Sequence, residues 1–211
     1  MWKYHTGSGY KQASTVIMNS KRLLLFFVGC SLVLVFASTN PVWAQGTYLT
    51  KDEFLKQSLG TSYHGHKLWL SKPIMQQLKN IFGHKYPGLR IRYWSNNNNA
   101  NQTAWILNEI GKVKPITFGV VVNNRKIESI YVLVFRESRG WEIKQTFFTD
   151  QFLGASLNNR LRLNQHIDSI SGATLSVIAM KKVARAALYL SQQIELTDPV
   201  ISHQPGEDES G

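Results

Sequence analysis

The chain has 211 residues, of which 43% are hydrophobic and 11% aromatic, so it can bury a core and global disorder is excluded. Its formal net charge is +11, but the basic residues are scattered and accompany no recognised binding motif, so we expect no nucleic-acid partner. The single cysteine is Cys30, in an apolar N-terminal stretch, so the rest of the chain can form neither a disulfide nor a thiolate metal site.

Residues 1–44 have the three parts of an export signal in the usual order. A Lys-Arg pair precedes the apolar run 23–37, and Ala44 ends a small-residue cleavage site. The apolar run of about 15 residues is shorter than the ~20 that cross a bilayer comfortably, so we predict a cleaved signal peptide and a mature chain that begins at Gln45. The alternative is an uncleaved membrane anchor. Both versions place the remainder in the periplasm or another extracytoplasmic space.

Residues 45–110 are predicted to contain two helices and two strands. The expected elements are helices at 50–59 and 71–82 and strands at 89–94 and 102–107. Thr50 and Glu53 have the spacing of a capping box, and Ser71 suits an N-cap. This region resembles no known pattern, so its structure is left open as an additional layer or a partner surface.

Residues 111–196 carry the clearest sheet and helix signals. The expected elements are strands at 116–122 and 127–135, joined as a hairpin, and helices at 145–153 and 175–194. The last helix is amphipathic, with Lys181, Lys182 and Arg185 outside its apolar arc. This order predicts an α+β domain, an antiparallel sheet with packed helices. The tail 197–211 is rich in proline and acidic residues and is predicted to be disordered.

The segment from Asp168 to Ser176 holds the residues that point to chemistry. Gly172 permits a tight turn, and Ser171 and Thr174 supply hydroxyl groups. The predicted helix start presents free amides and the positive end of the helix dipole, which together suit a phosphate group. The alternative is that Ser171 or Thr174 merely caps the helix.

The pattern Asp-x-x-Ser-Gly-Ala-Thr over residues 168–174 resembles the flavinylation motif of the FMN-binding domain family. That family includes the flavin subunits of the sodium-pumping NADH:quinone reductase and of the Rnf complexes. Five fixed positions make the match specific. The resemblance implies that FMN is attached covalently, through a phosphoester to Thr174, by a flavin transferase. It implies a cofactor site that also includes Asp168, Ser171, Gly172, Ala173, Leu175 and Ser176.

A second stretch, Glu137-Ser138-Arg139-Gly140, follows the predicted strand that ends at Phe135. It resembles the Glu-Ser/Thr-x-Gly segment that lies near the flavin in family members, which implies that Glu137, Ser138 and Gly140 belong to the cofactor site. The chain lacks the histidine before this glutamate and the further glycine of the Rnf-type pattern. The resemblance, over roughly residues 111–194, is therefore to a separate branch.

Other polar and aromatic residues have structural explanations. His64 and His66 lack a nearby carboxylate, so we expect no metal site there. Four tryptophans could either flank a flavin ring or pack in the core: Trp69, Trp94, Trp105 and Trp141. For Arg139, one interpretation is a contact with the flavin and the other is a solvated position in the loop. His166 lies two residues before the motif.

These patterns predict an exported flavoprotein that relays electrons between membrane and extracytoplasmic redox proteins. We recognise no substrate site and no acid–base pair, so an electron-transfer protein is favoured over a stand-alone enzyme. One alternative is a subunit or catalytic component of a flavin-dependent extracytoplasmic reductase. Another is a non-redox binding module in which Thr174 is only a helix cap.

Overall fold

The computed structural model describes residues 46–197, which all belong to one compact unit of the chain. The predicted signal peptide or anchor over residues 1–44 lies outside the described residues. The predicted disordered tail also lies outside them, except for Thr197, which is the last residue of a helix. Among the described residues, no helix is both long and apolar enough to span a bilayer.

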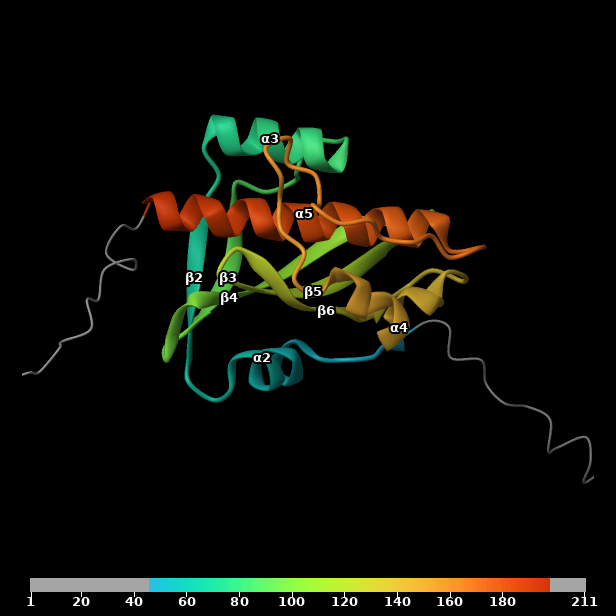
Figure 1. Cartoon of the computed structure of the whole chain (residues 1–211), viewed down its shortest axis with the longest axis horizontal. Helices are drawn as coiled ribbons and strands as arrows, with labels where there is room; N and C mark the ends of the chain where they lie inside the picture. Colours follow the sequence, from blue (N-terminus) through green and yellow to red (C-terminus); the bar gives the residue numbers. More distant parts are fainter. Residues whose placement is uncertain (1–45, 198–211) are drawn as a thin grey trace, which may run out of the picture. The chain divides into compact units, whose positions relative to one another are not determined.

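A six-stranded antiparallel sheet forms the centre of the fold and confirms the predicted α+β class (Figure 1). Its order is β1-β6-β5-β4-β3-β2, so β2 to β6 are neighbours in chain order and β1 adds an edge beside β6. The strands are Gly46–Thr47 (β1), Tyr63–Trp69 (β2), Arg90–Asn96 (β3), Asn99–Ile110 (β4), Pro115–Asn123 (β5) and Lys126–Phe135 (β6). Residues 46–110 therefore share one sheet with the C-terminal region.

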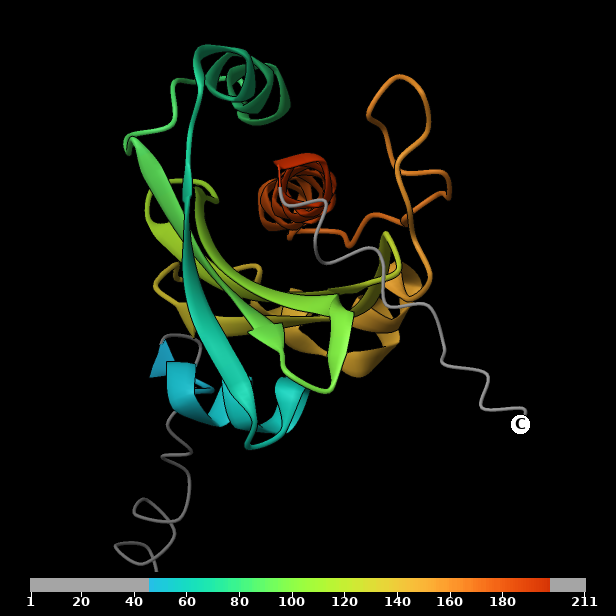
Figure 2. The same ribbon diagram turned by 90° about the vertical axis from the view of Figure 1, so that its left-hand side faces the viewer.

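Helices cover both faces of this sheet (Figures 1 and 2). Helix α5 (Thr174–Thr197) lies on one face with α3 (Lys72–Phe82) packed against it, and α2 (Lys51–Leu59) lies on the other. Three short helical segments follow β6: η1 (Trp141–Lys144), α4 (Thr146–Thr149) and η2 (Asp150–Phe152). The start of α5 is reached through an irregular segment, residues 153–173.

The two cores follow from strand alternation, because successive side chains point to opposite faces of a sheet. On β4, Trp105 and Leu107 are buried on the α5 side, whereas Ala104 is buried on the α2 side. Gly119 on β5 allows a close approach of α2, because a Cβ there would lie 2.6 Å from the ring of Phe54. The sheet thus carries an apolar layer on each face.

Several local predictions are confirmed. Thr50 and Glu53 form the reciprocal capping box at the start of α2. The hairpin between β5 and β6 turns through positive φ angles at Asn124 and Arg125. Ser71 occupies the N-cap position of α3, although its side chain makes no capping hydrogen bond.

Other predictions differ from the structure. The sequence pattern predicts neither β1 nor β2, because β1 has only two residues and β2 is a polar edge strand that contains Gly65 and buries Leu68 alone. The single helix predicted at 145–153 is divided into the short segments α4 and η2. The strand predicted at 102–107 is longer at both ends, since β4 pairs with β5 as far as Ile110 and with the end of β3 at Asn99.

Candidate functional site

The phosphate-binding candidate lies at the N-terminus of α5. The carbonyl of Ala173 accepts a hydrogen bond from the amide of Val177 (3.0 Å), so Ala173 is the N-cap and Thr174 is the first helical residue. Alanine has no side-chain acceptor, so the N-cap residue leaves the first amides of the helix open to a ligand. Neither Ser171 nor Thr174, the two predicted cap residues, occupies the N-cap position.

The chain enters this helix through a tight turn. Gly172 has a φ of +80°, in the left-handed region that glycine adopts without a steric cost. The amide of Ala173 then donates to the carbonyl of Ile170 (3.0 Å). Ala173 and Ser176 are buried, whereas Ser171, Gly172 and Thr174 are exposed. Thr174 is therefore exposed at the helix start, and the positive end of the helix dipole lies beside it.

The loop after β6 packs directly against this helix start, which brings together two segments more than thirty residues apart in the sequence. Gly140 has a φ of +87°, and a Cβ on it would lie 2.5 Å from Oγ of Ser176 and 3.5 Å from Cα of Ala173. The Glu137–Gly140 segment and the Thr174 motif are thus neighbours in space.

Glu137 has a structural position within this arrangement. Its carboxylate is buried, with 6% of the residue exposed, and Oε1 accepts hydrogen bonds from the amides of Lys112 (2.7 Å), Val113 (2.5 Å) and Lys114 (2.7 Å). Burial raises the pKa of this carboxyl, but the three amide donors outweigh burial and hold the pKa below its ordinary value. The carboxylate is therefore directed at the turn between β4 and β5.

The preceding residue reinforces this anchor. Arg136 Nη1 donates to the carbonyl of Pro115 and to Oγ1 of Thr117, each at 3.0 Å. Glu137 and Arg136 thus tie the loop after β6 to the β4–β5 turn and to the start of β5. Sequence analysis did not select Arg136, and its position next to a candidate site residue was the available signal. Ser138 and Arg139, between this anchor and Gly140, are exposed.

Apolar side chains are exposed on the first turns of α5. Leu175 is 47% exposed and Ile178 is 42% exposed. Ile178 was not predicted as a site residue, although it lies four residues after Thr174 and so on the same side of the helix. An apolar surface beside a phosphate site fits a ligand that combines an anionic group with a flat ring system.

The remaining predicted residues are more dispersed. Asp168 is exposed, its backbone amide donates to Oε1 of Gln151 (2.7 Å), and its carboxylate pairs with His166 (3.4 Å). Trp141 follows Gly140 directly and is half-buried. The other three tryptophans lie on strands away from the two loops: Trp105 in the α5-side core, Trp94 half-buried on the α2 side, and Trp69 exposed beneath Arg90.

The two histidines of the sequence analysis lie on β2. His66 Nε2 is 2.8 Å from Oγ of Ser95, and its ring stacks on Tyr93. Within residues 46–197, no group of three or more His, Cys, Asp or Glu side chains is arranged to hold a metal ion.

The comparison with protein-family models agrees with the sequence resemblance. The protein-family model described as "FMN-binding domain" matches residues 111–189. A crystal structure of NqrC from Shewanella oneidensis is similar over 64% of this chain and 81% of that chain, with 13% sequence identity and a TM-score of 0.46. No curated protein matches the sequence.

The family match covers all the segments that meet at the site: the β4–β5 turn held by Glu137, the loop of Gly140 and the first turns of α5. An open helix start suits the FMN phosphate, and the exposed apolar residues beside it suit the ring. Residues 111–189 of this chain match the family model of an FMN-binding domain.

Proposed function

We propose that this protein is an exported electron carrier whose FMN is linked through a phosphoester to Thr174. A flavin transferase would install the cofactor, and membrane and extracytoplasmic redox proteins would exchange electrons with it. The observation that carries the proposal is the position of Thr174: an exposed hydroxyl at the first helical residue, beside amides that the N-cap leaves open.

The residues around Thr174 have separate contributions to such a site. The amides and dipole at the start of α5 stabilise a phosphate group there. Gly172 permits the turn that exposes the Thr174 hydroxyl, and Gly140 lets the second loop approach the helix without steric overlap. Leu175 and Ile178 offer apolar contacts that keep water from one side of a ring.

The cofactor would supply the redox chemistry, because flavin exchanges either one or two electrons. A covalent tether keeps FMN on the protein in a compartment where free flavin is dilute. Attachment joins Thr174 Oγ1 to the phosphorus of FMN, so the protein gains the mass of FMN less one water.

Intact mass spectrometry tests the attachment. The full chain and its Thr174→Ala variant are expressed in cells that contain a flavin transferase. We expect the wild-type protein to carry one FMN and the variant to carry none. Ser169→Ala is the matched control, because it removes an exposed hydroxyl at an unspecified position of the motif and should leave the FMN mass in place. A wild-type protein without FMN, or a Thr174→Ala protein that still gains it, would contradict the proposal.

A further inference from the structure

A groove of about 350 Å³ lies along α5, between α3 and the irregular segment 153–173. Figure 2 looks along α5 and shows α3 on one side of the helix and this segment on the other. Ile81, Leu163 and Ile178 supply apolar surface in the groove. Its other main lining residues are cationic or titratable: His166, Lys181, Lys182 and Arg185.

Positive charge in this groove is only partly neutralised. Lys182 Nζ donates to Oε1 of Glu109, a buried carboxylate whose Oε2 is also 2.9 Å from Nε2 of His84. Lys181 and Arg185 are held differently: Lys181 Nζ donates to the carbonyl of Ile167 (2.6 Å) and Arg185 Nε to that of Leu161 (2.7 Å). A neutral carbonyl positions a cation without cancelling its charge, so both side chains keep further donors for an anion.

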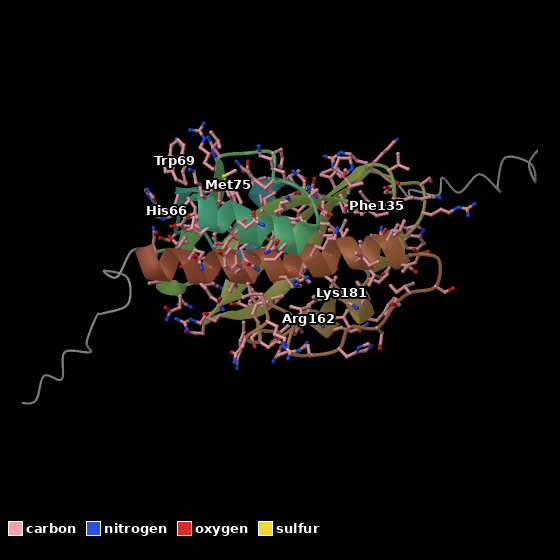
Figure 3. All side chains as sticks on the ribbon, turned by 90° about the horizontal axis from the view of Figure 1, so that it is seen from above. His66, Trp69, Met75, Phe135, Arg162 and Lys181 are labelled. Carbon is pink, nitrogen blue, oxygen red and sulfur yellow. The ribbon has the colours of Figure 1, made fainter. Side chains whose placement is uncertain are left out.

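A second arginine adds to this charge. Burial is the main cause of the lowered pKa of the Arg185 guanidinium. The positive charge of Arg162 nearby is the second cause and lowers this pKa further. Figure 3 shows Arg162 and Lys181 on the same side of α5. The backbone around Arg162 is fixed, since Asn158 Oδ1 accepts from its amide (3.1 Å). Two guanidinium groups held together repel each other, and a bound carboxylate would offset that repulsion.

The groove begins one helical turn from the proposed flavin site. Ile178, Lys181 and Arg185 follow Thr174 by four, seven and eleven residues, which places them roughly 6, 10 and 16 Å along the helix axis. All three lie on the same side of α5 as Thr174, because these spacings are close to whole turns. A protein segment in the groove would therefore lie beside a flavin on Thr174.

We propose that this groove docks an acidic segment of a partner protein, in which carboxylates pair with Lys181, Arg185 and Arg162 and an apolar side chain contacts Ile178. This inference rests on the proposed function in one respect: the partner is taken to be the protein that exchanges electrons with the flavin. An extended segment fits better than a small anion, since the apolar and cationic groove residues from Ile178 to Arg185 span about two turns of helix.

Binding of a fluorescent peptide with four glutamates and two leucines to the full chain tests the docking site. Lys181→Gln/Arg185→Gln removes two positive charges from the groove, and we expect it to weaken binding about tenfold at low salt. Lys67→Gln/Arg92→Gln is the matched control, because it removes the same charge from an exposed pair on β2 and β3. It should change the affinity by less than about twofold. Circular dichroism checks that both variants are folded.

Equal weakening by the two double variants would overturn the proposal, since binding would then follow net charge alone. The chain also has its own acidic residues at 207–209. A chain that ends at Thr197 tests them as a rival occupant: if the peptide binds only to this shortened chain, the groove belongs to the protein's own tail and the proposal fails. Thr174→Ala should bind the peptide like wild type, so loss of FMN attachment and loss of docking are separate outcomes.

Discussion

At the scale of single residues, Glu137 has the most sharply defined role in the site. Its carboxylate accepts hydrogen bonds from three consecutive backbone amides of the β4–β5 turn, so one side chain fixes a turn that lies far from it in sequence. Hydrogen bonds to an ionised acceptor are stronger than neutral ones. Glu137, which the family resemblance places near the flavin, therefore fixes the backbone of the β4–β5 turn.

Replacing Glu137 with alanine should lower the free energy of unfolding by about 2–3 kcal/mol, because three amides lose a charged acceptor and can only partly be resolvated by water. Chemical denaturation at neutral pH measures this change. Ser138→Ala, at the next and exposed position, is the control and should stay within about 0.5 kcal/mol of wild type. A Glu137→Ala protein as stable as the control would show that the amides do not depend on the carboxylate.

The same contact predicts a direction of pH dependence. The pKa of Glu137 is depressed in the folded protein, so its stabilisation is present above the ordinary carboxyl pKa and is lost as the pH falls through the folded-state pKa. Glu137→Gln keeps an oxygen acceptor and cannot ionise. The stability difference between wild type and Glu137→Gln should therefore shrink as the solution is acidified.

At the scale of elements, the site depends on how the loop after β6 fits against α5. Gly140 faces the buried side of the first helical turn, where Ser176 lies. No larger residue fits between them without displacing the loop or the helix. This contact sets the distance between the loop and the start of α5, which carries Thr174.

Gly140→Ala should therefore reduce FMN attachment as well as stability. Its Cβ would approach Ser176 Oγ to 2.5 Å, and the φ of +87° adds strain of about 1–3 kcal/mol. Gly154→Ala is the matched control, because Gly154 has a φ of +74° but no atom within 4 Å of the added Cβ. Both variants should lose stability, and intact mass should show a lower FMN fraction for Gly140→Ala alone. Equal FMN fractions in the two variants would rule out the packing effect.

At the scale of the whole described unit, the sheet extends well beyond the segment that matches the family. Residues 111–189 include β5, β6 and most of α5, whereas β1 to β4 come from residues 46–110. Helix α5 packs on both β4 and β5, and the buried Trp105 and Leu107 lie on β4. The matched segment therefore lacks β4 and α3, two of the elements on which α5 packs.

A chain that contains only residues 111–211 should not fold cooperatively, because β5 would become an open edge and the apolar face of α5 would lose the contacts from β4. Thermal unfolding monitored by circular dichroism measures this. The chain from Trp43 to Gly211, the complete compact unit, is the reference and should give a single transition. A similar transition in the short chain would show that residues 46–110 are dispensable for folding.

Local signals were sufficient for most elements. The capping box at Thr50, the β-branched runs on either side of the 123–126 turn and the apolar arc of the last helix each depend on near neighbours, and each was predicted. The edge strand β2 was missed because its sequence is polar and its pairing with β3 supplies the order. The Asp168–Thr174 motif was recognisable because a fixed set of residue types at fixed spacing is a property of the sequence itself.

Sequence by itself determined the α+β class, the hairpin and the FMN-binding motif, since these depend on short-range periodicity and on residue identity. The tertiary structure alone decided three things: that residues 46–110 share the sheet, that Glu137 binds the β4–β5 turn, and that Gly140 meets Ser176. Each of these is a contact between segments distant in the chain. Such contacts depend on how strands pair and helices pack, and no local pattern of residues specifies them.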